Sequence, residues 1–267
     1  MVELESLSIV YSTPAGGVPA VSDISMSLER GGIHAIIGAS GCGKTSNVQA
    51  MAGLLPPTSG EIRIAGERLS GIRAGTAVIF QDFGLLPWKT VYANAELPLR
   101  LGGLPLRERK ARVMPLLAEL GLESFLELYP LRLSGGMKQR LAVARALVSE
   151  PDLLLMDEPF SSLDALTREG MQDMLLEVHA RHGATIVLVT HSIEEAAYLS
   201  DSVTVMRGRN PGRMGARLET GRREGRVTPA FRASPAFLAR TSAIREALED
   251  GARRESEALR SESGTSP

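Results

Sequence analysis

The chain has little of several features that would assign it to other classes of protein. Its 267 residues include a single cysteine, so no internal disulfide can form and a reducing compartment is expected. The formal net charge is -1, which leaves no basic excess for binding nucleic acid. There is no run of about eighteen apolar residues, so we expect no membrane-spanning segment. The first residues lack the basic end and apolar centre of a signal peptide, and we expect none.

Apolar content is ordinary, at 43% of residues, and the length suits one large domain or two small ones. Four short apolar runs predict buried parallel strands, and they alternate with helical patterns. These runs are residues 33–37, 77–80, 153–156 and 184–190. Residues 2–29 alternate between polar and apolar positions, which predicts short strands joined by a loop at residues 13–19. Residues 91–128 read as helical, and we expect them to form an inserted helical subdomain.

Residues 38–45 read GASGCGKT and fit the pattern G-x-x-x-x-G-K-[ST]. The glycines let backbone N–H groups turn toward phosphate oxygens, and the helix expected next adds its positive N-terminal end. Lys44 should reach the β- and γ-phosphates of a nucleotide, and the Thr45 hydroxyl should bind Mg²⁺. The candidate phosphate-binding residues are Gly38, Ala39, Ser40, Gly41, Cys42, Gly43, Lys44 and Thr45.

Two further motifs lie downstream. Residues 153–159, LLLMDEP, place Asp157 and Glu158 at the carboxyl end of a buried strand, where open α/β sheets bind their ligands. Asp157 suits Mg²⁺, and Glu158 suits a general base, a role worth roughly 10²–10⁴-fold in rate. Residues 133–140, LSGGMKQR, open a helix with Ser134, Gly135 and Gly136. That element taken alone is either a plain helix cap or an anion site at a helix N-terminus.

Taken together, these motifs resemble those of the ATP-binding cassette (ABC) ATPases, over residues 2 to about 212. In that family the element corresponding to Ser134-Gly135-Gly136 binds the phosphates of an ATP held by a second subunit. The implied fold is a P-loop NTPase (RecA-like) α/β core with an N-terminal antiparallel β subdomain and an inserted α-helical subdomain. We expect the ATPase domain over residues 1–215, its helical subdomain over about 88–148, and a C-terminal extension over 216–267.

The resemblance also implies roles for isolated residues. Gln81 resembles the Q-loop glutamine, which touches Mg²⁺ and the attacking water, and His191 resembles the switch histidine at the γ-phosphate. Asp164 lies in the D-loop that crosses the dimer interface, and Tyr11 stands where an aromatic ring stacks on adenine. The implied sets are listed by role: catalytic, Glu158, His191 and Gln81; metal-binding, Thr45, Gln81 and Asp157; nucleotide-binding, Tyr11, Asp164, residues 38–45 and Ser134, Gly135 and Gly136.

Some positions depart from the family pattern. Asn47 interrupts an apolar run, and we expect it to lie on a helix face or to make a local hydrogen bond. Ser192 replaces the usual aspartate but forms a capping box with Glu195, so the helix start should survive. Met137 is typical of many bacterial importer ATPases.

Finer detail points to one branch of the family. Residues 82–90 (DFGLLPWKT), 193–201 and 210–214 look like the ATPases of nitrate, taurine and alkanesulfonate importers, with close relatives that serve thiamine-precursor pyrimidines. Trp88 follows the Q-loop, where such proteins receive the permease, although it fits core filling equally well.

The function that the resemblance implies is the ATP-hydrolysing subunit of an importer. ATP and Mg²⁺ would be bound by a homodimer, which would drive two transmembrane permease subunits fed by a periplasmic or extracellular substrate-binding protein. The chain would lie peripherally on the cytoplasmic face of the inner membrane, with no nucleic acid as partner.

Three alternatives remain. A DNA-repair ATPase would need a coiled coil, yet residues 46–133 show no sustained heptads. A ribosome-associated protein would carry two cassettes. A module without turnover would not need both Glu158 and His191.

The last part of the chain has its own pattern. Residues 212–228 suit edge strands or loops, and Ser234-Pro235 is a helix start. We expect that helix to present an apolar stripe made of Phe237, Leu238, Ile244 and Leu248. Beyond Asp250 the chain has little to bury, which predicts fraying or disorder.

Overall fold

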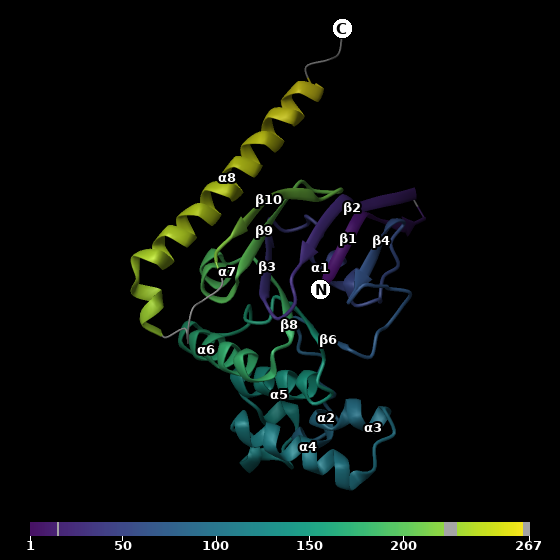
Figure 1. The fold of residues 1–267 in the computed structure, drawn as a ribbon, viewed down its shortest axis with the longest axis vertical. Coiled ribbons are helices and arrows are strands. Elements are labelled where there is room, and N and C mark those ends of the chain that lie inside the picture. The colour runs from purple at the N-terminus through teal and green to yellow at the C-terminus, as the bar shows by residue number, and fades with distance from the viewer. Residues whose placement is uncertain (15, 222–228, 264–267) are drawn as a thin grey trace. The chain divides into compact units, whose positions relative to one another are not determined.

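The structure is a computed structural model that describes residues 1–14, 16–221 and 229–263, with residues 255–263 as backbone only. The chain divides into two compact units (Figure 1). Unit 1 comprises Met1–Arg73 and Thr185–Pro267, and unit 2 comprises Ala74–Ala184. No helix within the described ranges is both long enough and apolar enough to cross a bilayer.

An antiparallel sheet forms the N-terminal part of unit 1. Its strands, in spatial order, are β2 (Gly16–Leu28), β1 (Val2–Thr13), β4 (Ser59–Ile64) and β5 (Glu67–Arg68). Apolar side chains on one face of β1, including Val2 and Leu4, are buried, as a half-buried strand requires. The predicted antiparallel subdomain is confirmed. The loop expected at residues 13–19 is wrong in extent, because the strands stay paired as far as Thr13 and Gly16.

A second sheet in unit 1 contains the strand that leads into the phosphate loop. Its strands, in spatial order, are β10 (Arg213–Glu219), β9 (Ser202–Arg207), β3 (Ile33–Gly38) and β8 (Thr185–Thr190). Strand β3 runs parallel to both β8 and β9, whereas β10 is an antiparallel edge strand. Every residue of β3 and β8 is buried, which explains their unbroken apolar sequences. Helices α1 (Lys44–Met51) and α7 (Ile193–Leu199) follow β3 and β8.

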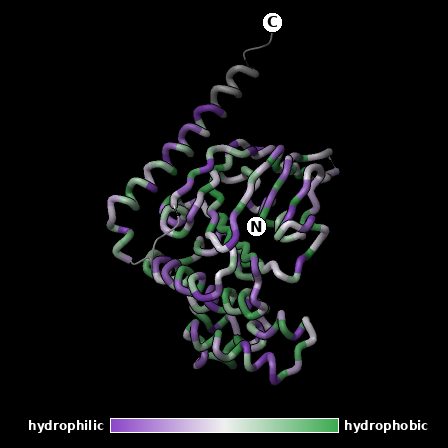
Figure 2. The backbone as a smooth tube through the Cα atoms, viewed as in Figure 1, coloured by the Kyte–Doolittle hydropathy of each residue, from purple (hydrophilic) through white to green (hydrophobic). Residues whose placement is uncertain are grey.

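The C-terminal part of unit 1 consists of η3 (Pro229–Ala233) and α8 (Pro235–Ser263). The predicted helix start is confirmed, because Ser234 Oγ accepts a hydrogen bond from Phe237 N at 3.2 Å. Ile244 is fully buried against α7 and β9, with Phe237 and Leu248 packed beside it. Leu238 was expected in the same stripe, but it is 62% exposed because it lies about 100° around the helix from Phe237. Hydrophobic and hydrophilic residues alternate along the part of α8 that is coloured by hydropathy in Figure 2.

An aromatic cluster fastens this extension to α7. The ring of Tyr198 lies 6.2 Å from Phe231 and 6.4 Å from Phe237, between centroids. The guanidinium of Arg232 stacks 3.6 Å from the Tyr198 centroid, a cation–π contact. Where the sequence predicted disorder beyond Asp250, α8 continues to Ser263, and residues 264–267 lie outside the described part. Residues 222–228, within the predicted edge segment, also lie outside it.

Unit 2 is built on two parallel strands, β6 (Thr76–Ile79) and β7 (Leu153–Asp157), with Thr76 opposite Leu153. The chain between them is helical, and α6 (Ala165–His182) follows β7. The intervening elements are α2 (Val91–Ala95), α3 (Leu97–Leu101), α4 (Leu106–Glu119), η1 (Glu123–Phe125), η2 (Pro130–Arg132) and α5 (Gly135–Leu147). These helices confirm the inserted helical part of the predicted α/β fold.

Candidate functional site

The loop from Gly38 to Lys44 joins the buried strand β3 to α1 in unit 1. Gly41 and Gly43 have φ values of 83° and 86°, in the left-handed region that favours glycine. A Cβ on Gly43 would lie 2.3 Å from Val21 Cγ1, so no larger residue fits there. Helix α1 begins with no side-chain cap, which leaves its first N–H groups available to an anion. The backbone of this loop therefore suits phosphate.

Lys44 is folded back into this loop. Its Nζ donates hydrogen bonds to Gly38 O at 2.8 Å and to Ala39 O at 3.0 Å, and the residue is only 7% exposed. The ammonium is thus held among backbone carbonyls at the mouth of the loop. Thr45, by contrast, is exposed and can offer its hydroxyl to a ligand. Cys42 is fully buried, as a small packed residue rather than an accessible nucleophile would be.

Two other predicted site residues of unit 1 lie near this loop. The Tyr11 hydroxyl is within 3.1 Å of Ser46 Oγ, so β1 brings the ring to the start of α1. His191 is exposed directly after β8. Because Ile37 pairs with Thr190, the phosphate loop and His191 leave neighbouring strands at the same edge of the sheet. Unit 1 therefore brings Tyr11, Lys44 and His191 to one region.

Both family departures in unit 1 have a structural explanation. Asn47 is 1% exposed, and its Nδ2 donates to Gly43 O at 3.2 Å, so the expected local hydrogen bond exists. Ser192 is the N-cap of α7, and its Oγ accepts from Glu195 N at 3.2 Å, which confirms the predicted helix start. The Glu195 carboxylate accepts a hydrogen bond from the Thr190 hydroxyl at 2.5 Å, which ties this helix start to the end of β8.

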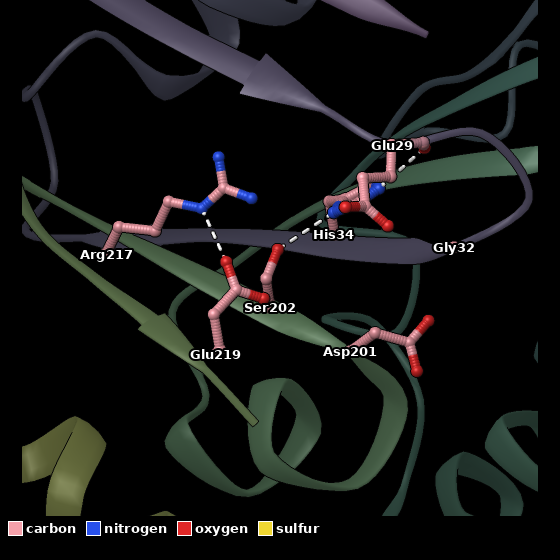
Figure 3. Close-up of a pocket in the computed structure, with 7 residues that line it drawn as sticks. All are labelled: Glu29, Gly32, His34, Asp201, Ser202, Arg217 and Glu219. Carbon is pink, nitrogen blue, oxygen red and sulfur yellow. Dashed lines mark hydrogen bonds and ion pairs between the residues drawn. The ribbon is translucent and has the colours of Figure 1, made fainter. Parts of the chain in front are cut away.

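A small polar cavity lies at the other end of β3 from the phosphate loop (Figure 3). The cavity has a volume of about 40 Å³, which is room for roughly one or two waters and far too little for a nucleotide. The His34 ring that lines it lies within 2.8 Å of Ser202 Oγ and 3.0 Å of Glu29 O. Burial lowers the pKa of His34, so the neutral ring is favoured. We therefore interpret the cavity as part of the protein's packing and not as the nucleotide site.

The acidic residues of unit 2 follow β7. Asp157 ends this wholly buried strand and is 7% exposed. Glu158 comes next, with a φ of 48°, which is unusual for any residue but glycine. Its carbonyl accepts hydrogen bonds from Ser161 N at 3.2 Å and Ser161 Oγ at 2.9 Å. A strained backbone held this firmly is a common feature of functional sites.

Gln81 lies at the same edge of the β6–β7 pair, because Ile79 is paired with Met156. Gln81 is exposed, and the turn after it is anchored by a residue that sequence reasoning missed. Arg145, on α5, donates to Phe83 O and Gly84 O, each at 2.7 Å. Burial lowers the pKa of Arg145. No local sequence signal marks this contact, because the two segments are distant along the chain.

Ser134 is the N-cap of α5, and its Oγ accepts from Met137 N at 3.3 Å, as predicted. Ser134 and Gly135 are exposed. A Cβ on Gly136 would lie 2.9 Å from Thr167 Cγ2, and one on Gly135 would lie 3.1 Å from Leu163 Cδ2. The glycines therefore also let α5 approach the start of α6 closely.

Asp164 is the N-cap of α6, where its Oδ1 accepts from Thr167 N at 3.0 Å. Hydrogen bonding from the Thr167 side chain and backbone lowers the pKa of Asp164. Trp88 is 70% exposed, so the core-filling alternative is wrong for this residue.

The parallel pairing of β6 and β7 brings Gln81, Asp157 and Glu158 of unit 2 to the same end of this strand pair.

The predicted Mg²⁺ ligands are chemically consistent with that ion. A threonine hydroxyl (Thr45), an amide oxygen (Gln81) and a carboxylate (Asp157) are the oxygen donors that Mg²⁺ prefers. Among the residues that the structure describes, no group of three or more His, Cys, Asp or Glu could hold a metal alone. This donor set fits Mg²⁺ that arrives with nucleotide phosphates rather than in an all-protein cage.

Comparisons with known proteins agree with one another. The family described as ABC transporter matches residues 21–161. The chain is 41% identical over 253 residues to the taurine import ATP-binding protein TauB of Rhizobium johnstonii, covering 93% of this chain and 96% of that one.

Solved structures show the same likeness. The ATP-binding cassette MJ0796, in a dimeric post-hydrolysis state bound to ADP and Pi, matches with a TM-score of 0.72 and 28% identity, over 82% of this chain and 98% of that one. The protein cbiO1 from Clostridium perfringens, part of the ABC transporter complex cbiONQ, matches with a TM-score of 0.72 and 28% identity, over 91% and 94% of the two chains.

Proposed function

Because the chain belongs to the ATP-binding subunits of the ABC transporter family, we propose that it powers the import of a small solute by ATP-driven closure of a dimer. It is an ATPase of the importer type, which converts ATP and water to ADP and phosphate. The solute classes that we propose are taurine or alkanesulfonates, nitrate, and thiamine-precursor pyrimidines. The first of these has support in the taurine import relative, which is similar over nearly the whole chain.

One observation carries the dimer proposal. A single chain presents two helix N-termini suited to an anion: α1, which has no side-chain cap, and α5, which opens with the exposed Ser134 and Gly135. In two copies paired head to tail, each ATP would lie between residues 38–45 of one copy and Ser134, Gly135 and Gly136 of the other. A dimeric cassette among the structural neighbours supports this arrangement.

We assign the phosphate contacts to unit 1. The N–H groups of the loop bind phosphate oxygens, and Lys44 exchanges its carbonyl partners for the β- and γ-phosphates. His191 contacts the γ-phosphate from the neighbouring strand end, and Tyr11 stacks on the adenine. None of these contacts requires a change in the strands, because each residue follows a strand or lies on one.

The remaining roles fall to unit 2 and to Thr45. Thr45, Gln81 and Asp157 would hold Mg²⁺, which would neutralise charge on the phosphates of ATP. Glu158 accepts a proton from the attacking water as general base. Its backbone carbonyl is held by the two hydrogen bonds from Ser161, which fixes the main chain from which the side chain extends.

The proposed transport role involves partner proteins. We propose two transmembrane permease subunits and a periplasmic or extracellular binding protein, with this chain peripheral on the cytoplasmic face of the membrane. The exposed Trp88, held on a turn beside α2, offers a surface to a permease. We propose residues 1–215 as the ATPase domain, residues 88–148 as its helical part, and residues 216–267 as an extension packed through α8.

The test of the proposed chemistry is Glu158→Gln. This change keeps the size of the side chain and removes the base, so kcat should fall about 10²–10⁴-fold while ATP still binds and the dimer is trapped. Glu127→Gln, an exposed change of the same kind in unit 2, is the matched control and should keep wild-type turnover. Lys44→Ala should instead weaken ATP affinity in a nucleotide titration. Full turnover by Glu158→Gln would remove Glu158 from the base role.

The transport role has a separate test. The native complex should co-purify with its permease, and its binding protein should bind one of taurine, alkanesulfonates, nitrate or thiamine-precursor pyrimidines. The alternative is an ABC ATPase that serves DNA repair or the ribosome. Stimulation of turnover by DNA or ribosomes, with no permease in the complex, would favour that alternative.

A further inference from the structure

The segment between Glu158 and α6 is a tight turn with its own internal hydrogen bonds. Ser161 N donates to Glu158 O, and Leu163 N donates to Phe160 O, each at 3.2 Å. Asp164 then caps α6 by accepting from Thr167 N. We call residues 160–164 the D-loop. Its backbone is therefore continuous with the proposed base at one end and with a capped helix at the other.

The side chain of Arg168 forms hydrogen bonds near both ends of the D-loop. Arg168, at the end of the first turn of α6, points back toward the helix N-terminus, as helical side chains do. Its Nε donates to Phe160 O at 3.3 Å, and its Nη2 donates to Leu163 O at 2.8 Å. A cation at this place opposes the helix dipole, which favours acids there. The hydrogen bonds to Phe160 O and Leu163 O compensate for this unfavourable interaction with the helix dipole. They also join two residues of the D-loop through one side chain.

The same loop contacts the start of α5. Leu163 lies against Gly135, and Thr167 lies against Gly136, so closely that a Cβ on either glycine would crowd them. Ser161 Oγ meanwhile holds the carbonyl of Glu158, whose φ of 48° needs such support. Within unit 2, a chain of packed groups therefore runs from Glu158 through the D-loop to the helix that begins at Gly135.

We infer that Arg168 is a positioning residue: by fixing the D-loop carbonyls, it sets the geometry of Glu158 and makes the α5 N-terminus move with it. The inference rests on the proposed function, because it takes Glu158 as the base. The proposed function gives Arg168 no contact with ATP. Its loss should therefore reduce kcat and leave the ATP affinity of the loop unchanged.

The experiment compares Arg168→Met and Arg168→Lys with the wild-type full-length chain. Methionine keeps the length of the stem without donors, whereas lysine keeps the charge but cannot donate from two separate nitrogens. We expect kcat, normalised to bound ATP, to fall about 10- to 100-fold in Arg168→Met and less in Arg168→Lys. The KM and Kd for ATP should stay within about threefold of wild type. A fall in kcat without a change in KM or Kd distinguishes a positioning role from a general loss of folded protein.

Arg181→Met is the matched control, because Arg181 lies on the same helix and pairs with Glu119 and Glu177. It should retain kcat within about twofold. If Arg168→Met fails to bind ATP, Arg168→Lys and Ser161→Ala decide the matter, since Ser161→Ala removes only the bond from Oγ to the Glu158 carbonyl.

Wild-type kcat in Arg168→Met overturns the inference. Where Arg168→Met does not bind ATP, wild-type kcat in both Arg168→Lys and Ser161→Ala overturns it, as does a loss of ATP affinity in these two variants that matches their loss of kcat. Glu158→Gln in the same assay separates the two proposals. An inactive Glu158→Gln beside a fully active Arg168→Met would leave the base assignment standing and remove Arg168.

Discussion

Asn47 is a polar side chain buried in the helix that follows the phosphate loop, and replacing it with leucine should stabilise the protein. The residue is 1% exposed. Its Nδ2 donates to Gly43 O at 3.2 Å and contacts Met206 Sδ at 3.3 Å. No donor in the described part of the chain reaches its buried Oδ1. A buried acceptor without a partner costs about 1–3 kcal/mol.

The contributions to the free energy of unfolding, taken together, favour leucine. The change removes the buried oxygen and sacrifices two Nδ2 hydrogen bonds. The bond to Gly43 O is worth about 0.5–1.5 kcal/mol, and the bond to Met206 Sδ is worth less because a thioether sulfur is a weak acceptor. Gly43 O keeps a partner, since the backbone N–H of residue 47 still donates to it at 3.0 Å. Leucine also has the higher helix propensity, by a few tenths of a kcal/mol. The expected gain is about 1 kcal/mol, equivalent to roughly 2–4 °C in melting temperature for a chain of this size.

Thermal and urea unfolding without nucleotide should measure this gain, because bound ATP would itself raise stability. Asn47→Asp is the counter-variant, since it has nearly the same shape and would bury a charge. It should destabilise the protein by more than leucine stabilises it. A lower melting temperature for Asn47→Leu, with unchanged ATP binding, would refute the account of Asn47 as an unsatisfied polar group.

Three further substitutions test other contacts by their effect on the free energy of unfolding. Gly136→Ala should cost about 1–3 kcal/mol, because its Cβ would meet Thr167 Cγ2 at 2.9 Å, and adding Thr167→Ser should restore most of the loss in urea unfolding. Ser192→Ala should cost about 1 kcal/mol in thermal unfolding by removing the cap on Glu195 N, whereas Ser192→Asp should keep wild-type stability. Arg145→Met should cost about 1–3 kcal/mol and make the turn at Phe83 more sensitive to limited proteolysis. If Arg145→Met keeps wild-type stability and resistance to proteolysis, the turn at Phe83 does not depend on the hydrogen bonds from Arg145.

Features that depend on a few neighbouring residues were predictable from the sequence. The helix caps at Ser134, Ser192 and Ser234 all form, because a cap needs only a side-chain oxygen and an N–H three residues away. The buried strands were equally clear, since strands covered on both faces must be apolar throughout. The order of motifs along those strands then indicated an ATPase of the ABC family.

Features that depend on distant parts of the chain were not predictable. The hairpin of β1 and β2 is longer than its pattern suggested, because pairing between strands extends through a segment rich in turn residues. Leu238 and Trp88 are exposed, although their apolar character is equally compatible with a core. Burial of a single apolar residue is decided by which neighbour covers it, and the sequence does not state that neighbour.

By itself, the sequence determined the phosphate loop, the acidic strand end and the glycine-opened helix, because each is a local backbone geometry that its own residues impose. Only the tertiary structure decided how these pieces are held. Arg145 reaches carbonyls 61 and 62 residues away, and Gly136 is needed where α5 meets Thr167. Such contacts depend on the path of the backbone through space, which no short pattern of residues encodes.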